Sequence, residues 1–201
     1  MLENIRTVKS RDRRSTPWSN RRGMTSEIAR GTPGHSGAPS WRLSVATLRE
    51  NAEFSLLRDI DRVFTVVGKA GVTLHFAEHQ LAATPLTPCS FAGEDSLFCE
   101  IIAPTEAFNV MVERSSAVTS VTSLVVTEQA SITSRTDSIV AVYVAGGSGR
   151  LDRRRVTSGD CVISWGGDGD FRGTARLLIV EIMPTAGQSS IAPIGADKTR
   201  R

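Results

Sequence analysis

The feature that most constrains the fold is a series of short apolar runs that alternate with a period of two and are separated by turn residues. In "WRLSVATL", Trp41, Leu43 and Val45 share one face, because successive side chains of a strand point to opposite sides. No segment keeps a helical period over three turns, although residues 46–59 have leucines and acids at a spacing that a short helix would accept. The pattern predicts an all-β chain.

The size of the chain suits this fold class. With 201 residues, of which 40% are hydrophobic, it can form one large all-β domain or two small ones around a substantial core. No apolar run approaches the roughly 20 residues of a membrane-spanning helix. The three cysteines, Cys89, Cys99 and Cys161, match no zinc spacing and no disulfide framework. Reduced thiols are therefore expected, in a cytoplasmic protein without a membrane partner.

Basic residues concentrate at the two ends, although the net charge is only +3. A basic tail can bind nucleic acid by releasing counterions. Short charged tails are more often simply disordered, and no aromatic side chain lies between Arg6 and Arg14 to stack on bases. Residues 1–15 are therefore predicted to be a disordered basic tail and residues 185–201 a flexible one, and nucleic acid is not expected as a partner.

The strand runs recur in two similar halves. "RVFTVVGKAGVTL" consists of two β-rich runs around Gly68–Gly71, a pattern typical of a hairpin. Each half later has a small-residue turn with a glycine–acid pair (Gly93-Glu94, Gly159-Asp160) and ends in a bulky apolar strand. Such halves indicate a duplicated barrel unit, and barrels remove exposed strand edges, although an ordinary sandwich could produce the same pattern. The predicted units are residues 16–114 and 115–184.

The chain shares five sequence blocks, in the same order, with a known protein family: "WSNRRGMTSEI", "WRLSVATL", "FSLLRDIDRVFTVVGKAGVTL", "FAGED" and "FNVMVER". Over roughly residues 18–114 the sequence resembles the HutD/Ves family. The resemblance implies a cupin fold (a double-stranded β-helix) repeated twice, that is, a bicupin barrel. It also implies no known catalytic reaction, and a role in binding a small catabolite and restraining the expression of histidine catabolism.

The sequence departs from the family pattern at several positions. Where the family usually has Trp-Lys-Asn followed by glycines, Ser19 replaces the lysine, and Arg21 and Arg22 replace two glycines. Asp59 stands where a glycine is common, and Glu113 where an arginine is common. Glycine permits close backbone approach and positive φ angles, which arginine does not. The entrance to the pocket is expected to differ accordingly.

Arg62 is the main candidate binding residue. In "DRVFTVVG", alternation places it on one face with Phe64 and Val66, and an arginine on an apolar face is costly unless something pairs with it. Its planar fork suits a carboxylate, so Arg62 is predicted to receive a small anionic metabolite. The family resemblance implies an acid of histidine catabolism, such as urocanate or formylated glutamate. The alternative is an internal ion pair with Asp61, Glu27 or Glu53.

Three polar residues of the first block are predicted to orient the ligand. In a strand from Met24 to Ile28, Thr25 and Glu27 share a face. Asn20, Thr25 and Glu27 together offer donors and acceptors that fix a ligand in an apolar cavity. The alternatives are a turn former for Asn20 and a solvated strand face for the other two.

Large and polar side chains on other strands complete the predicted site. Trp18, Trp41 and Phe108 are large enough to form pocket walls, although such residues more often fill a core. The predicted strand "FNVMVER" has large side chains on both faces, and Asn109 is a polar residue among them. Asn109 is either a ligand contact or a hydrogen-bonded amide in the core. Arg42 and Ser44, which share a face of "WRLSVA", are weaker candidates.

No metal or other cofactor is expected. Many cupins hold a metal with several histidines and a glutamate, whereas this chain has only His35, His75 and His79. The last two lie four apart, but no third ligand follows at a useful spacing. Neither Cys89 nor Cys99 has a histidine near it in sequence that could activate it as a nucleophile.

The sequence therefore predicts a metal-free small-molecule binding protein. The alternative is a metal-free cupin enzyme, an isomerase or lyase acting on an amino-acid derivative, with Glu27 as its general base. A homodimer is an expectation from the fold class alone.

Overall fold

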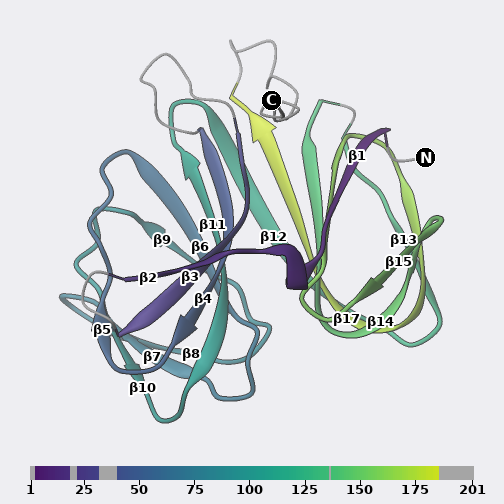
Figure 1. Ribbon diagram of the computed structural model, residues 1–201. Helices are drawn as coiled ribbons and strands as arrows, with labels where there is room; N and C mark the ends of the chain where they lie inside the picture. Colours follow the sequence, from purple (N-terminus) through teal and green to yellow (C-terminus); the bar gives the residue numbers. More distant parts are fainter. Residues whose placement is uncertain (1–2, 19–21, 32–39, 136, 186–201) are drawn as a thin grey trace, which may run out of the picture.

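The computed structural model describes residues 3–18, 22–31, 40–135 and 137–185, which form two β-units side by side (Figure 1). Among these residues there is no α-helix, only a 3-10 turn at Ser10–Asp12, and hence no helix with the length and composition of a membrane span. The predicted all-β class is confirmed. The short helix considered within residues 46–59 is not formed, because residues 46–48 end one strand and residues 52–53 form another.

The first unit contains two antiparallel sheets. The six-stranded sheet has the order β2 (Ser15–Pro17), β3 (Gly23–Arg30), β4 (Trp41–Leu48), β11 (Thr105–Glu113), β6 (Ile60–Val66) and β9 (Cys89–Ala92). The four-stranded sheet has the order β5 (Ala52–Glu53), β10 (Phe98–Ile101), β7 (Val72–His75) and β8 (Gln80–Ala83).

The second unit is one antiparallel sheet of seven strands. Its main order is β1 (Glu3–Val8), β16 (Cys161–Trp165), β14 (Ile139–Leu151), β17 (Gly169–Pro184) and β12 (Ala117–Val126). β13 (Gln129–Ile132) pairs with β17, and β15 (Arg154–Thr157) pairs with β14. An apolar cluster that includes Leu151, Phe171 and Leu177 packs within this unit.

The central strands of the first unit are buried on both faces, which is why their sequences carry bulk at successive positions. On the face directed toward the second unit, Leu43, Val63 and Val110 join Ile139 and Leu178 in one apolar cluster. Burial of this cluster holds the two units together, because apolar surface removed from water contributes roughly 25 cal/mol per Å². The opposite face of β4, β11 and β6 is left to line the interior of the first unit.

The predicted hairpin around Gly68–Gly71 is wrong. β6 pairs with β11 and β9, whereas β7 pairs with β10 and β8, so the chain passes from one sheet to the other at this point. The N–H groups of Val67 and Gly68 both donate to the carbonyl of Glu106, at 2.8 and 3.0 Å. A glycine-rich connection between two strands fits a hairpin and a crossover equally well, and only the tertiary pairing decides between them.

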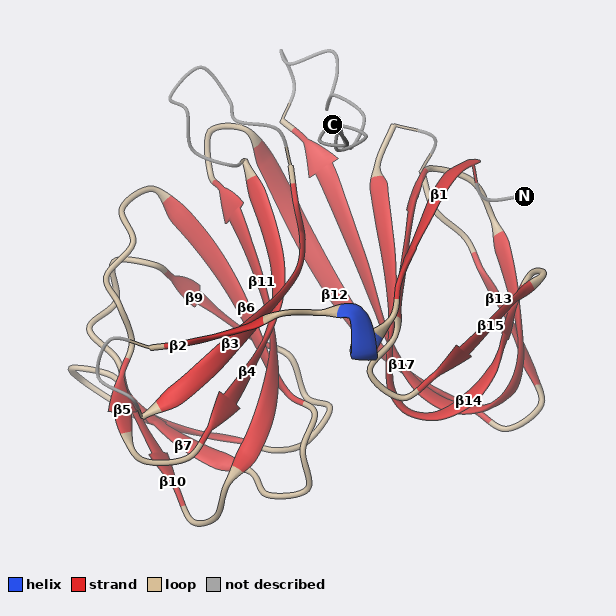
Figure 2. Ribbon diagram, in the orientation of Figure 1, coloured by secondary structure: helices blue, strands red, loops and turns tan. Residues whose placement is uncertain are grey.

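The N-terminal segment is not the disordered tail predicted for residues 1–15. β1 pairs with β16 of the second unit and β2 pairs with β3 of the first, so that residues 3–17 cross both units (Figure 2). Residues 1–2 and 186–201, the latter most of the predicted C-terminal tail, lie outside the described residues. The predicted boundary at residues 114–115 falls between β11 and β12.

A buried carboxylate explains why this charged segment is ordered. Asp160 is only 2% exposed, and its oxygens accept hydrogen bonds from the Lys9 ammonium at 2.9 Å, the Ser10 N–H at 3.0 Å and the Thr157 N–H at 3.0 Å. Burial alone would raise the pKa of Asp160, but these hydrogen bonds and the positive charge of Lys9 outweigh it and lower the pKa. The composition of a segment does not reveal such an anchor more than 140 residues away.

We expect Asp160→Asn to lower the free energy of unfolding at pH 7 by about 2–3 kcal/mol, since it places an amide donor against three donors. The pKa of the Asp160 carboxyl is lower in the folded protein than in the unfolded chain, where it is near 3.9. The ionised carboxylate therefore stabilises the fold above that pH, and this stabilisation is lost as the pH falls through the pKa of the folded state. Urea unfolding at pH 7 and in steps below about pH 4 tests both points. An undiminished difference between wild type and variant at the lowest pH would contradict the assignment.

Candidate functional site

A cavity of about 270 Å³ lies within the first unit. The strand register brings its lining together in two cross-strand rows. In one row Met111 lies between Arg42 and Arg62, and in the next Asn109 lies between Ser44 and Phe64. The remaining lining residues come from the position after β2, from β3, the end of β4, β5 and the segment after β5: Trp18, Thr25, Ala46, Leu48, Glu53, Phe54, Ser55 and Leu57.

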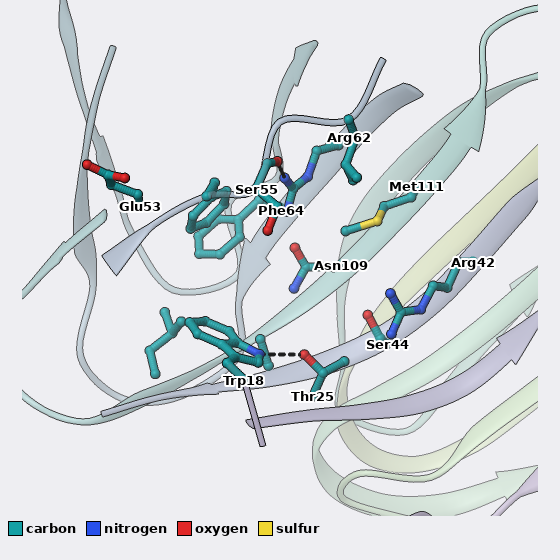
Figure 3. A pocket seen from close by; sticks show the side chains of 14 residues that line it. Trp18, Thr25, Arg42, Ser44, Glu53, Ser55, Arg62, Phe64, Asn109 and Met111 are labelled. Carbon is teal, nitrogen blue, oxygen red and sulfur yellow. Dashed lines mark hydrogen bonds between the residues drawn. The ribbon is translucent and has the colours of Figure 1, made fainter. Parts of the chain in front are cut away.

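Arg62 is the buried charge of this cavity (Figure 3). It is 8% exposed, and its Nη1 donates to the carbonyl of Ser55 at 3.4 Å, while its Nε has no hydrogen-bond partner among the described residues. The guanidinium lies over the rings of Phe54 and Phe91, 4.7 and 5.4 Å from their centroids. Burial, together with the positive charge of Arg42, lowers the pKa of Arg62 to about 10. The side chain therefore remains charged at neutral pH.

The described residues supply no carboxylate partner for Arg62. Asp61 pairs with Arg114 at 2.8 Å, and Glu27 lies between two other arginines. Glu53 lines the cavity but forms no ion pair within the described chain, and Figure 3 shows it at the far end from Arg62. None of the three acids considered from the sequence neutralises this guanidinium.

Glu27 is not part of the cavity lining. Its two carboxylate oxygens accept from the Nε atoms of Arg30 and Arg42, each at 3.2 Å. It faces a neighbouring hollow of about 440 Å³, which shares Trp18, Thr25 and Arg42 with the cavity. These two contacts hold Glu27 beside Arg42, at the edge of the cavity.

Trp18 and Thr25 close one side of the cavity together. The indole Nε1 of Trp18 donates to the Thr25 hydroxyl at 2.7 Å, as Figure 3 shows. Both line the cavity as predicted, although the Thr25 oxygen is already used as an acceptor. Asn20 lies outside the described residues. Arg22, one of the residues that replace the family's glycines, donates to the carbonyl of Asn51 at 3.2 Å and is not a lining residue.

Ser44 and Asn109 form the polar floor of the cavity. They are 2% and 5% exposed, and the Asn109 amide donates to the carbonyl of Ala107 at 3.3 Å. Both were candidates from the sequence, and the register confirms that they lie next to each other on β4 and β11. A buried hydroxyl and a buried amide can offer hydrogen bonds to a ligand without competition from bulk water.

Trp41 and Phe108, predicted as pocket walls, lie on the opposite face of the sheet. Trp41 is 1% exposed and Phe108 is fully buried, both in the cluster between the two units. Phe108 stacks on Tyr143 of β14, with ring centroids 4.7 Å apart. Alternation along β11 places Phe108 and Asn109 on different faces, so the two could not have lined the same cavity.

The residues that the sequence did not identify come mainly from the segment after β5. Phe54, Ser55 and Leu57 line the cavity, and this irregular segment has no period from which its inward side chains could be read. Met111 and Phe64 are different, because their alternation with Asn109 and Arg62 already indicated the cavity face.

The segment after β5 is held in place by an ion-pair network. Arg114 bridges Asp61 at 2.8 Å and Glu94 at 3.0 Å, and Glu94 also accepts from the N–H of Asp59 at 2.6 Å. The hydrogen bonds from Arg114 and from the Asp59 N–H lower the pKa of Glu94 to about 2. Asp59, at a position where glycine is common in the family, has a φ of 62°, a conformation that aspartate tolerates better than most residues.

A backbone contact fixes the other side of this segment. The N–H of Leu57 donates to the carbonyl of Gly93 at 2.7 Å, and the N–H of Gly93 donates to the carbonyl of Ile60 at 2.6 Å. A Cβ on Gly93 would collide with the Leu57 carbonyl oxygen, so the close approach requires glycine. The wall of the cavity that contacts Arg62 is thus fixed from outside the cavity.

The described residues contain no group of three or more histidine, cysteine or acidic side chains that could hold a metal ion. His75 pairs with Glu100 at 2.8 Å, His79 stacks on Phe76, and His35 lies outside the described residues.

The three cysteines are free and buried. Burial raises the pKa of Cys99 and Cys161 to about 12 and also raises that of Cys89. A thiol with a raised pKa is a poor nucleophile at neutral pH.

Comparison with known proteins identifies the family. The HutD family model matches residues 10–178 of this chain. Protein Ves from Cronobacter sakazakii is 30% identical over 169 residues, which cover 82% of this chain and 87% of that protein. An uncharacterized 21.2 kDa protein in the hutC 3' region of Pseudomonas putida is 26% identical over 102 residues, half of this chain and 54% of that protein.

A solved structure agrees with these matches over nearly the whole fold. HutD from Pseudomonas fluorescens superposes with a TM-score of 0.80 at 25% identity, over 90% of this chain and all of that one. The chain therefore belongs to the HutD family.

Proposed function

We propose that this protein binds a small anionic metabolite in the cavity of the first unit, with the ligand's carboxylate on Arg62. The observation that carries the proposal is a guanidinium that is 8% exposed and has no carboxylate within ion-pair distance among the described residues. A buried charge without a counterion is costly. An incoming carboxylate would remove that cost and accept hydrogen bonds from the guanidinium.

The size and lining of the cavity support a small, partly polar ligand. Liquid water occupies about 30 Å³ per molecule, so a cavity of about 270 Å³ has room for about nine such volumes, or a ligand of about ten non-hydrogen atoms. Ser44 and Asn109 offer hydrogen bonds, whereas Phe54 and Phe64 offer apolar surface. Such a mixture, with few polar groups at fixed positions, is typical of metabolite sites.

The link to histidine utilisation rests on the relatives. One carries the name HutD, and another is named for its place in the hutC 3' region. The ligand would then be an acid of that pathway, such as urocanate or a formylated glutamate, and its binding would moderate the pathway. A cytoplasmic location is proposed as well, supported by three cysteines that are free.

Isothermal titration calorimetry with matched ligand pairs tests the proposal. We expect urocanate or N-formylglutamate to bind at least about 30-fold more tightly than its amide, because only the carboxylate neutralises Arg62. The matched controls are the amide of urocanate and the diamide of N-formylglutamate, since they keep the shape and remove the carboxylate charge. Equal affinity for acid and amide, or no binding of any small carboxylate in a thermal-shift screen, would refute an anion site.

A further inference from the structure

A row of three arginines crosses the sheet of the second unit. In the strand register Arg150 of β14 lies opposite Arg155 of β15 on one side and opposite Arg172 of β17 on the other. All three side chains are exposed. Directly opposed residues on neighbouring strands have Cβ atoms about 5 Å apart, and like charges in such pairs destabilise the sheet. The fold therefore keeps three positive charges together at a cost to its own stability.

The described residues supply no acid that neutralises this row. None of the ion pairs found in the described part of the chain includes Arg150, Arg155 or Arg172. The two acids on the adjoining turn and strand form no ion pair with it: Asp152 Oδ1 accepts from the N–H of Asp170, its Oδ2 has no hydrogen-bond partner among the described residues, and the Asp170 carboxylate accepts from the Ser131 hydroxyl. The charge of the row remains available to an external anion.

Further groups suited to phosphate surround the row. Arg153 and Arg176 are also exposed. The neighbouring cross-strand row consists of Thr157, Ser148 and Thr174, all exposed hydroxyl residues. Serine and threonine hydroxyls are common phosphate donors in protein–DNA contacts.

Glycines lie beside the row on β14. β14 has Gly146, Gly147 and Gly149 next to Ser148 and Arg150. The guanidinium of Arg176 lies directly against Gly146, where a Cβ would be 2.6 Å from its Nη2. The absence of side chains at these glycines leaves the neighbouring guanidinium groups accessible to a polyanion.

The chemistry of this face favours a nucleic-acid duplex. Arginine forks match phosphate oxygens. Strands about 4.8 Å apart make the row about 10 Å long, and phosphates along one strand of a duplex recur about every 3.4 Å. None of the exposed large apolar residues of the described chain lies on β14, β15 or β17; the nearest in the register is Val125 of β12, which pairs with Arg176. The three strands therefore offer no exposed aromatic rings for single-stranded bases, and one valine is too little apolar surface for a lipid bilayer.

We propose that the face defined by Arg150, Arg155 and Arg172 binds the phosphate backbone of double-stranded nucleic acid without sequence preference. This face belongs to the second unit, whereas the metabolite cavity is in the first (Figure 1). Nucleic acid was not expected from the sequence because only the terminal basic segments were considered. The arginine row is created by strand register, which joins residues 150, 155 and 172.

Fluorescence anisotropy with a labelled duplex of about 30 base pairs tests the proposal on the full chain. Between about 50 and 200 mM KCl, we expect log Kobs of the wild type to fall with log[KCl] at a slope of about −3, the value for three phosphate contacts. The triple variant Arg150→Gln/Arg155→Gln/Arg172→Gln should lose at least about 10-fold in affinity at the lowest salt, with a slope near zero.

The control variant Arg11→Gln/Arg49→Gln/Arg58→Gln removes the same charge from exposed positions elsewhere. Each triple changes the formal net charge from +3 to 0, so a specific face predicts that the control keeps both affinity and slope. Circular dichroism and melting curves verify that the variants fold. The proposal is overturned by a wild type that does not bind the duplex, by equal losses in both triples, or by binding to anionic vesicles in place of DNA.

Discussion

Arg62→Met is expected to abolish carboxylate binding and at the same time to stabilise the protein. Removing one partner of a buried charge pair costs about 2–5 kcal/mol of binding, which corresponds to an affinity loss of about 30-fold or more. Without ligand, in contrast, the Arg62→Met variant is relieved of a buried guanidinium that has no acid partner in the wild type. Replacing buried charges by apolar side chains of similar length is often stabilising, here by about 1–2 kcal/mol after the loss of ring contacts to Phe54 and Phe91.

Calorimetry and urea unfolding of the same preparations measure both effects. Arg58→Met is the matched control, because Arg58 is exposed and close in sequence but does not line the cavity; it should change neither affinity nor stability appreciably. A destabilised Arg62→Met variant with unchanged affinity would mean that the guanidinium is structural. Opposite changes in stability and binding are typical of sites that are strained for function.

Phe108→Ala is expected to cause the largest loss of stability of any variant considered, about 3–5 kcal/mol. The ring is fully buried between the two units and stacks on Tyr143 of β14. Its removal leaves a cavity in the cluster that holds the units together, and the surrounding strands can relax only partly. Urea unfolding measures the loss.

A comparison of variants at Phe108 and at its neighbour Asn109 tests which face of β11 borders the ligand. Phe108→Leu, a milder change that keeps the protein folded, should leave the ligand affinity within about 2-fold, because the side chain faces away from the cavity. Asn109→Ala, one position along and on the cavity face, should weaken binding while costing only about 1 kcal/mol of stability. If Phe108→Leu weakened binding more than Asn109→Ala, the ligand would bind on the Phe108 face of β11, and the predicted site on the Asn109 face would be wrong.

Alternation along single strands explains how much of the site could be predicted from the sequence. The period of two correctly placed Arg62 with Phe64 and separated Asn109 from Phe108. It could not say which face of β11 would border a cavity and which would pack on the second unit, since both carry apolar bulk. Of the residues predicted for the site, Trp41 and Phe108 therefore lie on the face that packs on the second unit, whereas Arg42, Ser44 and Asn109 line the cavity.

The sequence by itself determined the all-β class and the burial of one arginine, because these follow from local period, composition and residue chemistry. Only the tertiary structure decided which strands pair across Gly68–Gly71, that residues 3–17 are anchored on Asp160, and that Arg150, Arg155 and Arg172 lie in one row. Each of these depends on contacts between residues distant in the chain, and a strand carries in its own sequence no record of its neighbour's register.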